Sequence, residues 1–76
     1  MKPSRDELLK RIYEYDQAYG GPLEIPFRDD QTGEFIPELP TLKTDVDYLM
    51  QNGYLYEPLS LTMRYILSLT EKGEAY

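Results

Sequence analysis

The chain is 76 residues long and carries a net charge of −6, from fourteen acidic and eight basic side chains. A chain of this length buries only about 60% of the surface that it exposes when unfolded, so we expect one core and a single domain over residues 1–76. The sequence contains no cysteine and no histidine, which excludes disulfides, thiolate metal sites and the usual general base near neutral pH. The composition therefore predicts a binding domain and not an enzyme, with no cofactor and no metal.

The acidic balance also bears on the partner and on the location of the protein. A net charge of −6 opposes the attraction to phosphate that dominates non-specific nucleic-acid binding. No apolar run approaches the ~20 residues of a membrane span, and the first four residues lead into charged side chains instead of a signal-peptide core. We therefore expect a cytoplasmic protein that does not contact a membrane.

A first helix is predicted over residues 4–19. Ser4 and Glu7 have the spacing of a capping box, in which each side chain bonds a backbone amide of the first turn. Apolar side chains then recur at helical spacing along one face. Gly20-Gly21-Pro22 is expected to end the helix. The apolar stripe consists of Leu8, Leu9, Ile12, Tyr13, Tyr15 and Tyr19.

Residues 21–40 contain four prolines, each of which removes a backbone donor and prevents a helix of ordinary length. We expect a short, irregular hairpin or a packed loop here, with a turn at 29–33 and at most one helical turn over 37–40. The acidic turn slightly resembles a calcium-binding loop. It lacks the bidentate glutamate at the twelfth loop position, so a plain turn is the favoured interpretation.

A second helix is predicted over residues 41–52. Leu42, Val46 and Leu49 recur at helical spacing, and Thr41 is the expected N-cap. Asn52-Gly53 supplies a left-handed stop.

The C-terminal residues predict two antiparallel strands, near 54–58 and 63–69, joined by a bend near 58–62. Thr70 is expected to cap a short final helix. The apolar positions of the helices and strands together predict the core. Its members are Leu8, Leu9, Ile12, Leu42, Val46, Leu49, Leu55, Leu67 and Leu69.

Two stretches carry a resemblance to a known family. Residues 46–56, VDYLMQNGYLY, are similar to the end of the recognition helix and the first wing strand of bacterial regulators of the multiple-antibiotic-resistance repressor class. Residues 67–73, LSLTEKG, resemble the last wing strand of that class and the start of its next helix. The chain also resembles small uncharacterised winged-helix proteins of bacilli and their prophages. The resemblance implies an α+β, winged-helix-like fold, in which helices pack on a small antiparallel sheet with a C-terminal wing hairpin.

The sequence departs from the DNA-binding members of that class. In those members a second helix braces the recognition helix, whereas residues 21–40 here are rich in proline. The outward face of the predicted recognition helix carries two carboxylates against one ammonium, and the wing offers only Arg64. Residues 1–76 are too few to contain the flanking helices through which many such regulators dimerise, so we expect a monomer or a surface-patch dimer. The outward positions are Lys43, Thr44, Asp45, Asp47, Tyr48 and Gln51.

Tyrosine is enriched in binding surfaces, because a rigid ring with a polar tip gives contact area at a low cost in entropy. Tyr48, Tyr54 and Tyr56 are the candidates, since Tyr48 lies off the apolar stripe and the other two alternate with Leu55. The alternative is that they cover the strand pair against residues 21–40. The one basic cluster, in the first helix, alternates with carboxylates and is interpreted as a solvated face. It comprises Lys2, Arg5, Lys10 and Arg11.

Two functions are compatible with these patterns. The first is a non-catalytic protein-interaction module with a regulatory role, which the negative charge favours. The alternative is a sequence-specific DNA-binding transcriptional regulator. Winged helices usually bind DNA, and Lys43, Thr44 and Gln51 lie on the predicted recognition helix. A continuous basic strip along residues 43–51 and Arg64 would favour DNA. The candidate partner-binding residues are Lys43, Thr44, Asp47, Tyr48, Gln51, Tyr54, Tyr56 and Arg64.

Overall fold

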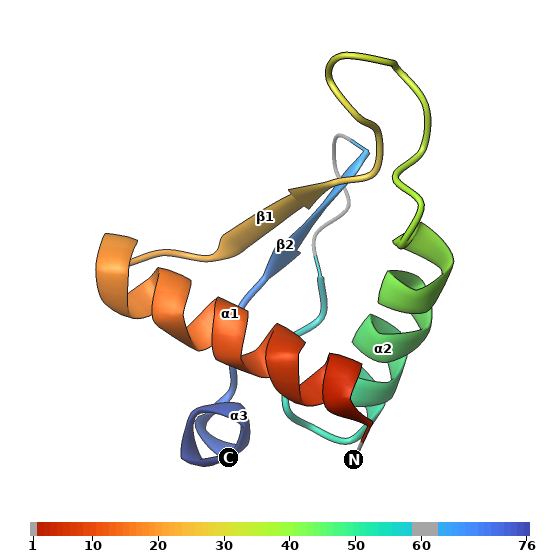
Figure 1. The fold of residues 1–76 in the computed structure, drawn as a ribbon. Helices are drawn as coiled ribbons and strands as arrows, with labels where there is room; N and C mark the ends of the chain where they lie inside the picture. Colours follow the sequence, from red (N-terminus) through yellow and green to blue (C-terminus); the bar gives the residue numbers. More distant parts are fainter. Residues whose placement is uncertain (1, 59–62) are drawn as a thin grey trace.

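The computed structural model describes residues 2–58 and 63–76. The described elements follow the order α1 (Pro3–Tyr19), β1 (Leu23–Pro26), α2 (Leu39–Gln51), β2 (Arg64–Leu67) and α3 (Glu71–Ala75). β1 and β2 form an antiparallel pair. Figure 1 shows α1 and α2 crossing beside this strand pair, with α3 at the end of the molecule where both chain ends lie. The α+β class is confirmed.

The start of α1 differs from the prediction. The helix begins at Pro3, its N-cap is Lys2, and no side chain caps it, so the capping box at Ser4 is wrong. Proline is favoured at the first helical position, because its fixed φ suits the helix and its missing N–H has no partner there in any case. The end of α1 is as predicted, since Gly20 takes a left-handed φ of 70° and its amide bonds the carbonyl of Asp16.

The start of α2 also lies earlier than predicted. The helix begins at Leu39 with Glu38 as its N-cap and Pro40 in its first turn, so the prediction of a Thr41 cap is wrong. Residues 37–40 do not form an isolated turn, because Pro40 occupies the first turn, where a missing amide costs no hydrogen bond.

The end of α2 confirms the Asn52-Gly53 stop. Gly53 has a φ of 81°, the amide of Tyr54 bonds the carbonyl of Leu49 at 2.9 Å, and the amide of Gly53 bonds the carbonyl of Met50 at 3.1 Å. These paired bonds form a Schellman motif, which satisfies the last carbonyls of the helix.

The pairing of the strands corrects the predicted C-terminal hairpin. β2 pairs along its whole length with β1, from Leu23 opposite Leu67 to Pro26 opposite Arg64. Of residues 54–58, Leu55 alone makes an isolated bridge, to Leu69. Pairing with β1 brings two alternating apolar side chains of β1 into the core, which the 54–58 segment cannot supply. The predicted bend near 58–62 lies, except for residue 58, outside the described residues.

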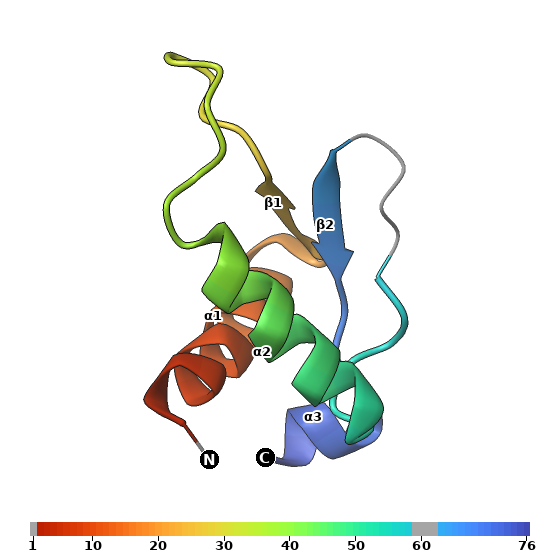
Figure 2. The same ribbon diagram turned by 90° about the vertical axis from the view of Figure 1, so that its right-hand side faces the viewer.

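The segment after β1 forms the predicted irregular hairpin. Arg28 pairs with Phe35 in an isolated bridge, and the Asp29 carboxylate accepts from the amides of Gln31 and Thr32 at 2.7 and 3.2 Å. This is an aspartate-stabilised turn of the ordinary kind. Figures 1 and 2 show the hairpin projecting away from the helices.

The core lies between α1, α2 and the inner face of the strand pair. It confirms the predicted members except Leu69, which is only half-buried. The sequence pattern missed Leu23 and Ile25 of β1 and Leu39 of α2, because these lie in the proline-rich stretch. The buried apolar residues are Leu8, Leu9, Ile12, Leu23, Ile25, Leu39, Leu42, Val46, Leu49, Leu55 and Leu67.

Candidate functional site

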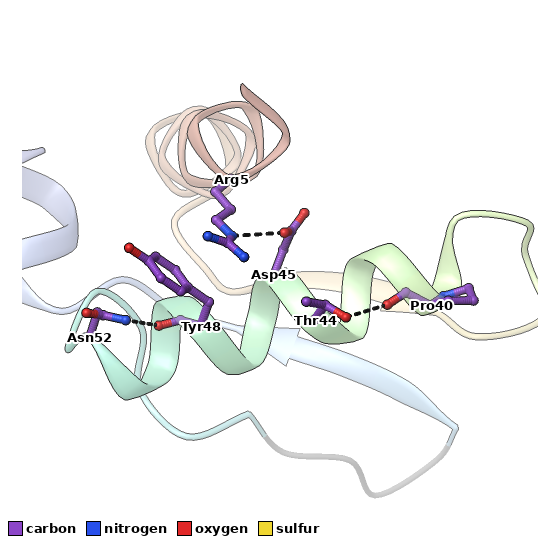
Figure 3. Close-up of polar contacts among 6 residues, drawn as sticks. All are labelled: Arg5, Pro40, Thr44, Asp45, Tyr48 and Asn52. Carbon is purple, nitrogen blue, oxygen red and sulfur yellow. Dashed lines mark hydrogen bonds and ion pairs between the residues drawn. The ribbon is translucent and has the colours of Figure 1, made fainter. Parts of the chain in front are cut away.

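An arginine of α1 is held between two side chains of α2 (Figure 3). The Nε of Arg5 donates to Oδ1 of Asp45 at 3.1 Å, and its guanidinium lies 3.7 Å from the centre of the Tyr48 ring. Asp45 is only 3% exposed. A planar guanidinium can bond a carboxylate and stack on an aromatic ring at the same time, so this one residue satisfies both neighbours.

This arrangement corrects two predictions. Asp45 does not point outward, and Arg5 does not belong to a solvated basic face. The signal for Asp45 was present in the sequence, because this residue follows Leu42 by three positions and precedes Leu49 by four. It therefore lies on the buried stripe of the helix.

The structure gathers five of the candidate residues on one exposed surface of α2, which we call the outward α2 face. It consists of Lys43, Thr44, Asp47, Tyr48 and Gln51, all of them exposed. The Thr44 hydroxyl donates to the carbonyl of Pro40 at 3.1 Å, and the side-chain amide of Asn52 donates to the carbonyl of Tyr48 at 2.8 Å (Figure 3). Asp47 and Gln51 are exposed and can meet a partner, whereas Thr44 is used locally and one side of the Tyr48 ring stacks on Arg5.

The charges of the outward α2 face balance. Lys43 and Asp47 are one helical turn apart, and the Lys43 ammonium lies 5.7 Å from the centre of the Phe27 ring. On the same side, burial and then the negative charge of Asp47 raise the pKa of Tyr65 above its ordinary value. Because Asp45 is withdrawn into its pair with Arg5, the face carries one cation and one anion.

The remaining candidates lie apart from this face. Tyr54 is half-buried against the core, its ring meets the Tyr76 ring edge-on at 5.5 Å, and the Lys72 ammonium lies 4.6 Å from its centre. Tyr54 thus has the covering role that was the alternative prediction. It packs against Lys72 of α3 and Tyr76, however, and not against residues 21–40. Arg64 reaches across the strand pair to Glu24, with 3.4 Å between Nη1 and Oε1.

Tyr56 is 61% exposed. Its backbone amide bonds the carbonyl of Ser68 at 3.1 Å. Because the Tyr56 ring is exposed, it is available to a partner, although Tyr56 does not belong to the outward α2 face.

Comparisons of the chain with protein-family models, with curated proteins and with solved structures gave no match. Within residues 2–58 and 63–76, no helix is long and apolar enough to cross a membrane. The same residues contain no group of three or more carboxylates placed to hold a metal ion.

Proposed function

We propose that this protein is a non-catalytic, winged-helix-like module that binds another protein through the outward α2 face. The observation that carries the proposal is the charge balance of that face, on which Lys43 is offset by Asp47 and accompanied by Tyr48 and Gln51. Protein interfaces combine such a tyrosine with mixed polar groups. A phosphate backbone requires several unpaired lysines or arginines.

The order of the elements supports the winged-helix interpretation. The amide of Tyr56 bonds the carbonyl of Ser68, and the amide of Thr70 bonds the carbonyl of Tyr54, both at 3.1 Å. These bonds place residues 54–56 beside the end of β2, as the first strand of a wing would lie. We infer from this order that α2 corresponds to the recognition helix, with residues 21–40 in place of the bracing helix.

The use of the basic side chains supports a protein partner over DNA. Arg5 is bonded to Asp45, Arg64 lies beside Glu24, and the Lys72 ammonium donates to a carbonyl at the end of α2. The continuous basic strip that would favour DNA is therefore missing along residues 43–51 and at Arg64.

The test is affinity capture from native cell extract with and without nuclease, followed by reconstitution with the purified captured protein. We expect one partner that survives nuclease treatment. Its affinity should fall about five- to thirtyfold with Tyr48→Ala or Gln51→Ala, since a central interface side chain contributes about 1–2 kcal/mol. The matched control is Gln17→Ala, an exposed glutamine of α1 that lies outside this face.

Two results would overturn the proposal. The first is a complex that nuclease dissolves, which would favour the DNA-binding alternative. The second is a purified complex whose affinity is the same for Gln51→Ala, Tyr48→Ala and Gln17→Ala.

A further inference from the structure

A groove of about 510 Å³ lies between α1 and α3, and its lining shares no residue with the outward α2 face. The buried Leu9 lines it, and two exposed tyrosines, Tyr13 of α1 and Tyr76 after α3, contribute to its walls. Asp6 and Glu74 add one carboxylate from each side. The volume is within the range of about 300–1,000 Å³ typical of ligand sites.

The α3 wall is firmly attached although the helix is short. The Lys72 ammonium donates to the carbonyl of Asn52 at 2.7 Å, and the Thr70 hydroxyl accepts from the amide of Gly73 at 3.2 Å. Gly73 packs so closely on Tyr54 that a Cβ there would collide with the Tyr54 carbonyl oxygen. The groove is therefore held by the packing of the fold, because only a glycine allows this approach.

Tyr76 follows α3 and lines the groove. Its ring packs edge-on against Tyr54. A hydrogen bond to Asp6, followed by burial, raises the pKa of the Tyr76 hydroxyl above its ordinary value. Asp6 and Tyr76 line the same groove from its two sides.

A carboxylate beside a tyrosine ring is the environment that Arg5 already occupies elsewhere in this chain, bonded to Asp45 and stacked on Tyr48. Arg28 stacks in the same manner on Phe35, 4.1 Å from the ring centre. The groove between α1 and α3 is lined by two carboxylates and two tyrosine rings, but no arginine lines it. Lys10 also lines the groove, but its side chain is 75% exposed and its ammonium lies 3.9 Å from the Glu14 carboxylate.

We propose that this groove binds an arginine side chain of a basic peptide segment on a partner protein. The guanidinium would donate to the Asp6 and Glu74 carboxylates and stack on the Tyr13 or Tyr76 ring. Charge-assisted hydrogen bonds and cation–π contacts are both strong in such a setting. The net charge of −6 attracts a basic segment from a distance.

The test is an NMR titration of the isotope-labelled chain with a capped pentapeptide in which two arginines alternate with glycines. The control peptide carries citrulline, which has nearly the same shape but no charge. We expect saturable shifts of the Leu9, Tyr13, Gly73 and Glu74 amides, with at least tenfold weaker binding of the citrulline peptide. Equal binding of both peptides, or shifts confined to other surfaces, would overturn the proposal, as would the absence of saturable shifts.

Variants locate the site. Glu74→Gln and Tyr13→Ala should each weaken the arginine peptide at least threefold, whereas Glu71→Gln, on the same helix but outside the groove, should leave its affinity within twofold. An unchanged affinity in Glu74→Gln and Tyr13→Ala would contradict the assignment. Gln51→Ala should not affect this peptide, so a failure of this site can be distinguished from a failure of the outward α2 face.

Discussion

Arg5 and Asp45, forty positions apart in sequence, form the ion pair that joins α1 to α2. Their side chains are only 13% and 5% exposed. The net stabilisation from such a buried ion pair is smaller than its short N–O distance suggests, because removing both charges from water costs free energy. Removing one partner is nevertheless costly, since it leaves the other charge enclosed without compensation.

Asp45→Ala should therefore lower the free energy of unfolding by about 3 kcal/mol, as expected for a broken buried pair. The matched control is Asp47→Ala, an exposed carboxylate two positions further along α2, which should change stability by no more than about 0.5 kcal/mol. Urea unfolding followed by circular dichroism measures both. Equal losses in the two variants would contradict the enclosed position of Asp45.

Gly53→Ala should lower stability by about 1–2 kcal/mol, because a side chain at a left-handed φ brings Cβ too close to the following carbonyl oxygen. The φ of Gly53 is 81°. Gly21 supplies the control, since it lies outside the left-handed region and a Cβ there meets nothing within 4 Å. Thermal unfolding should show Gly21→Ala at or slightly above the stability of the unmodified chain. A Gly53→Ala variant as stable as Gly21→Ala would argue against the Schellman ending of α2.

The pKa of Tyr65 predicts a loss of stability at alkaline pH. Burial and the charge of Asp47 raise this pKa above 10.0 in the folded protein. The folded state therefore holds the proton more tightly than the unfolded chain does. This stabilising contribution is complete below pH 10.0 and is lost as pH rises through the higher pKa of the folded state.

Tyr65→Phe should remove the stabilising contribution of the Tyr65 hydroxyl proton. Urea midpoints at about pH 9 and about pH 11 should show a smaller alkaline loss in Tyr65→Phe than in the unmodified chain, because phenylalanine does not titrate. Tyr56→Phe, which removes the hydroxyl of an exposed tyrosine, is the matched control. An identical alkaline loss in Tyr65→Phe and the unmodified chain would contradict the environment described for Tyr65.

The local features of the fold could be predicted from the sequence, because each depends on neighbouring residues. The spacing of Leu42, Val46 and Leu49 predicted a helix, Asn52-Gly53 predicted its end, and Thr70 indeed caps α3 through the amide of Gly73. Both helices start earlier than the hydroxyl residues predicted, because a proline occupies the first turn and needs no hydroxyl cap.

The features that join distant parts of the chain were not predictable in the same manner. β2 could pair with the nearby 54–58 segment or with β1, and burial of Leu23 and Ile25 decides between them only in three dimensions. The groove between α1 and α3 combines positions near both ends of the sequence. Asp45 was placed on the wrong side because its charge suggested solvent, although its spacing indicated the core.

We propose that the outward α2 face meets a protein and not a phosphate backbone. The most direct measurement is an anisotropy titration of the unmodified chain against random and genomic duplexes at ~150 mM salt, where specific sites bind at ~10⁻⁸ M or tighter. We predict binding weaker than the ~10⁻⁴ to 10⁻⁶ M of ordinary non-specific complexes, because the net charge is −6 and Lys43 is the one cation on the outward α2 face. One duplex sequence bound in the nanomolar range, with that affinity lost in Gln51→Ala, would contradict the claim and establish the DNA-binding alternative.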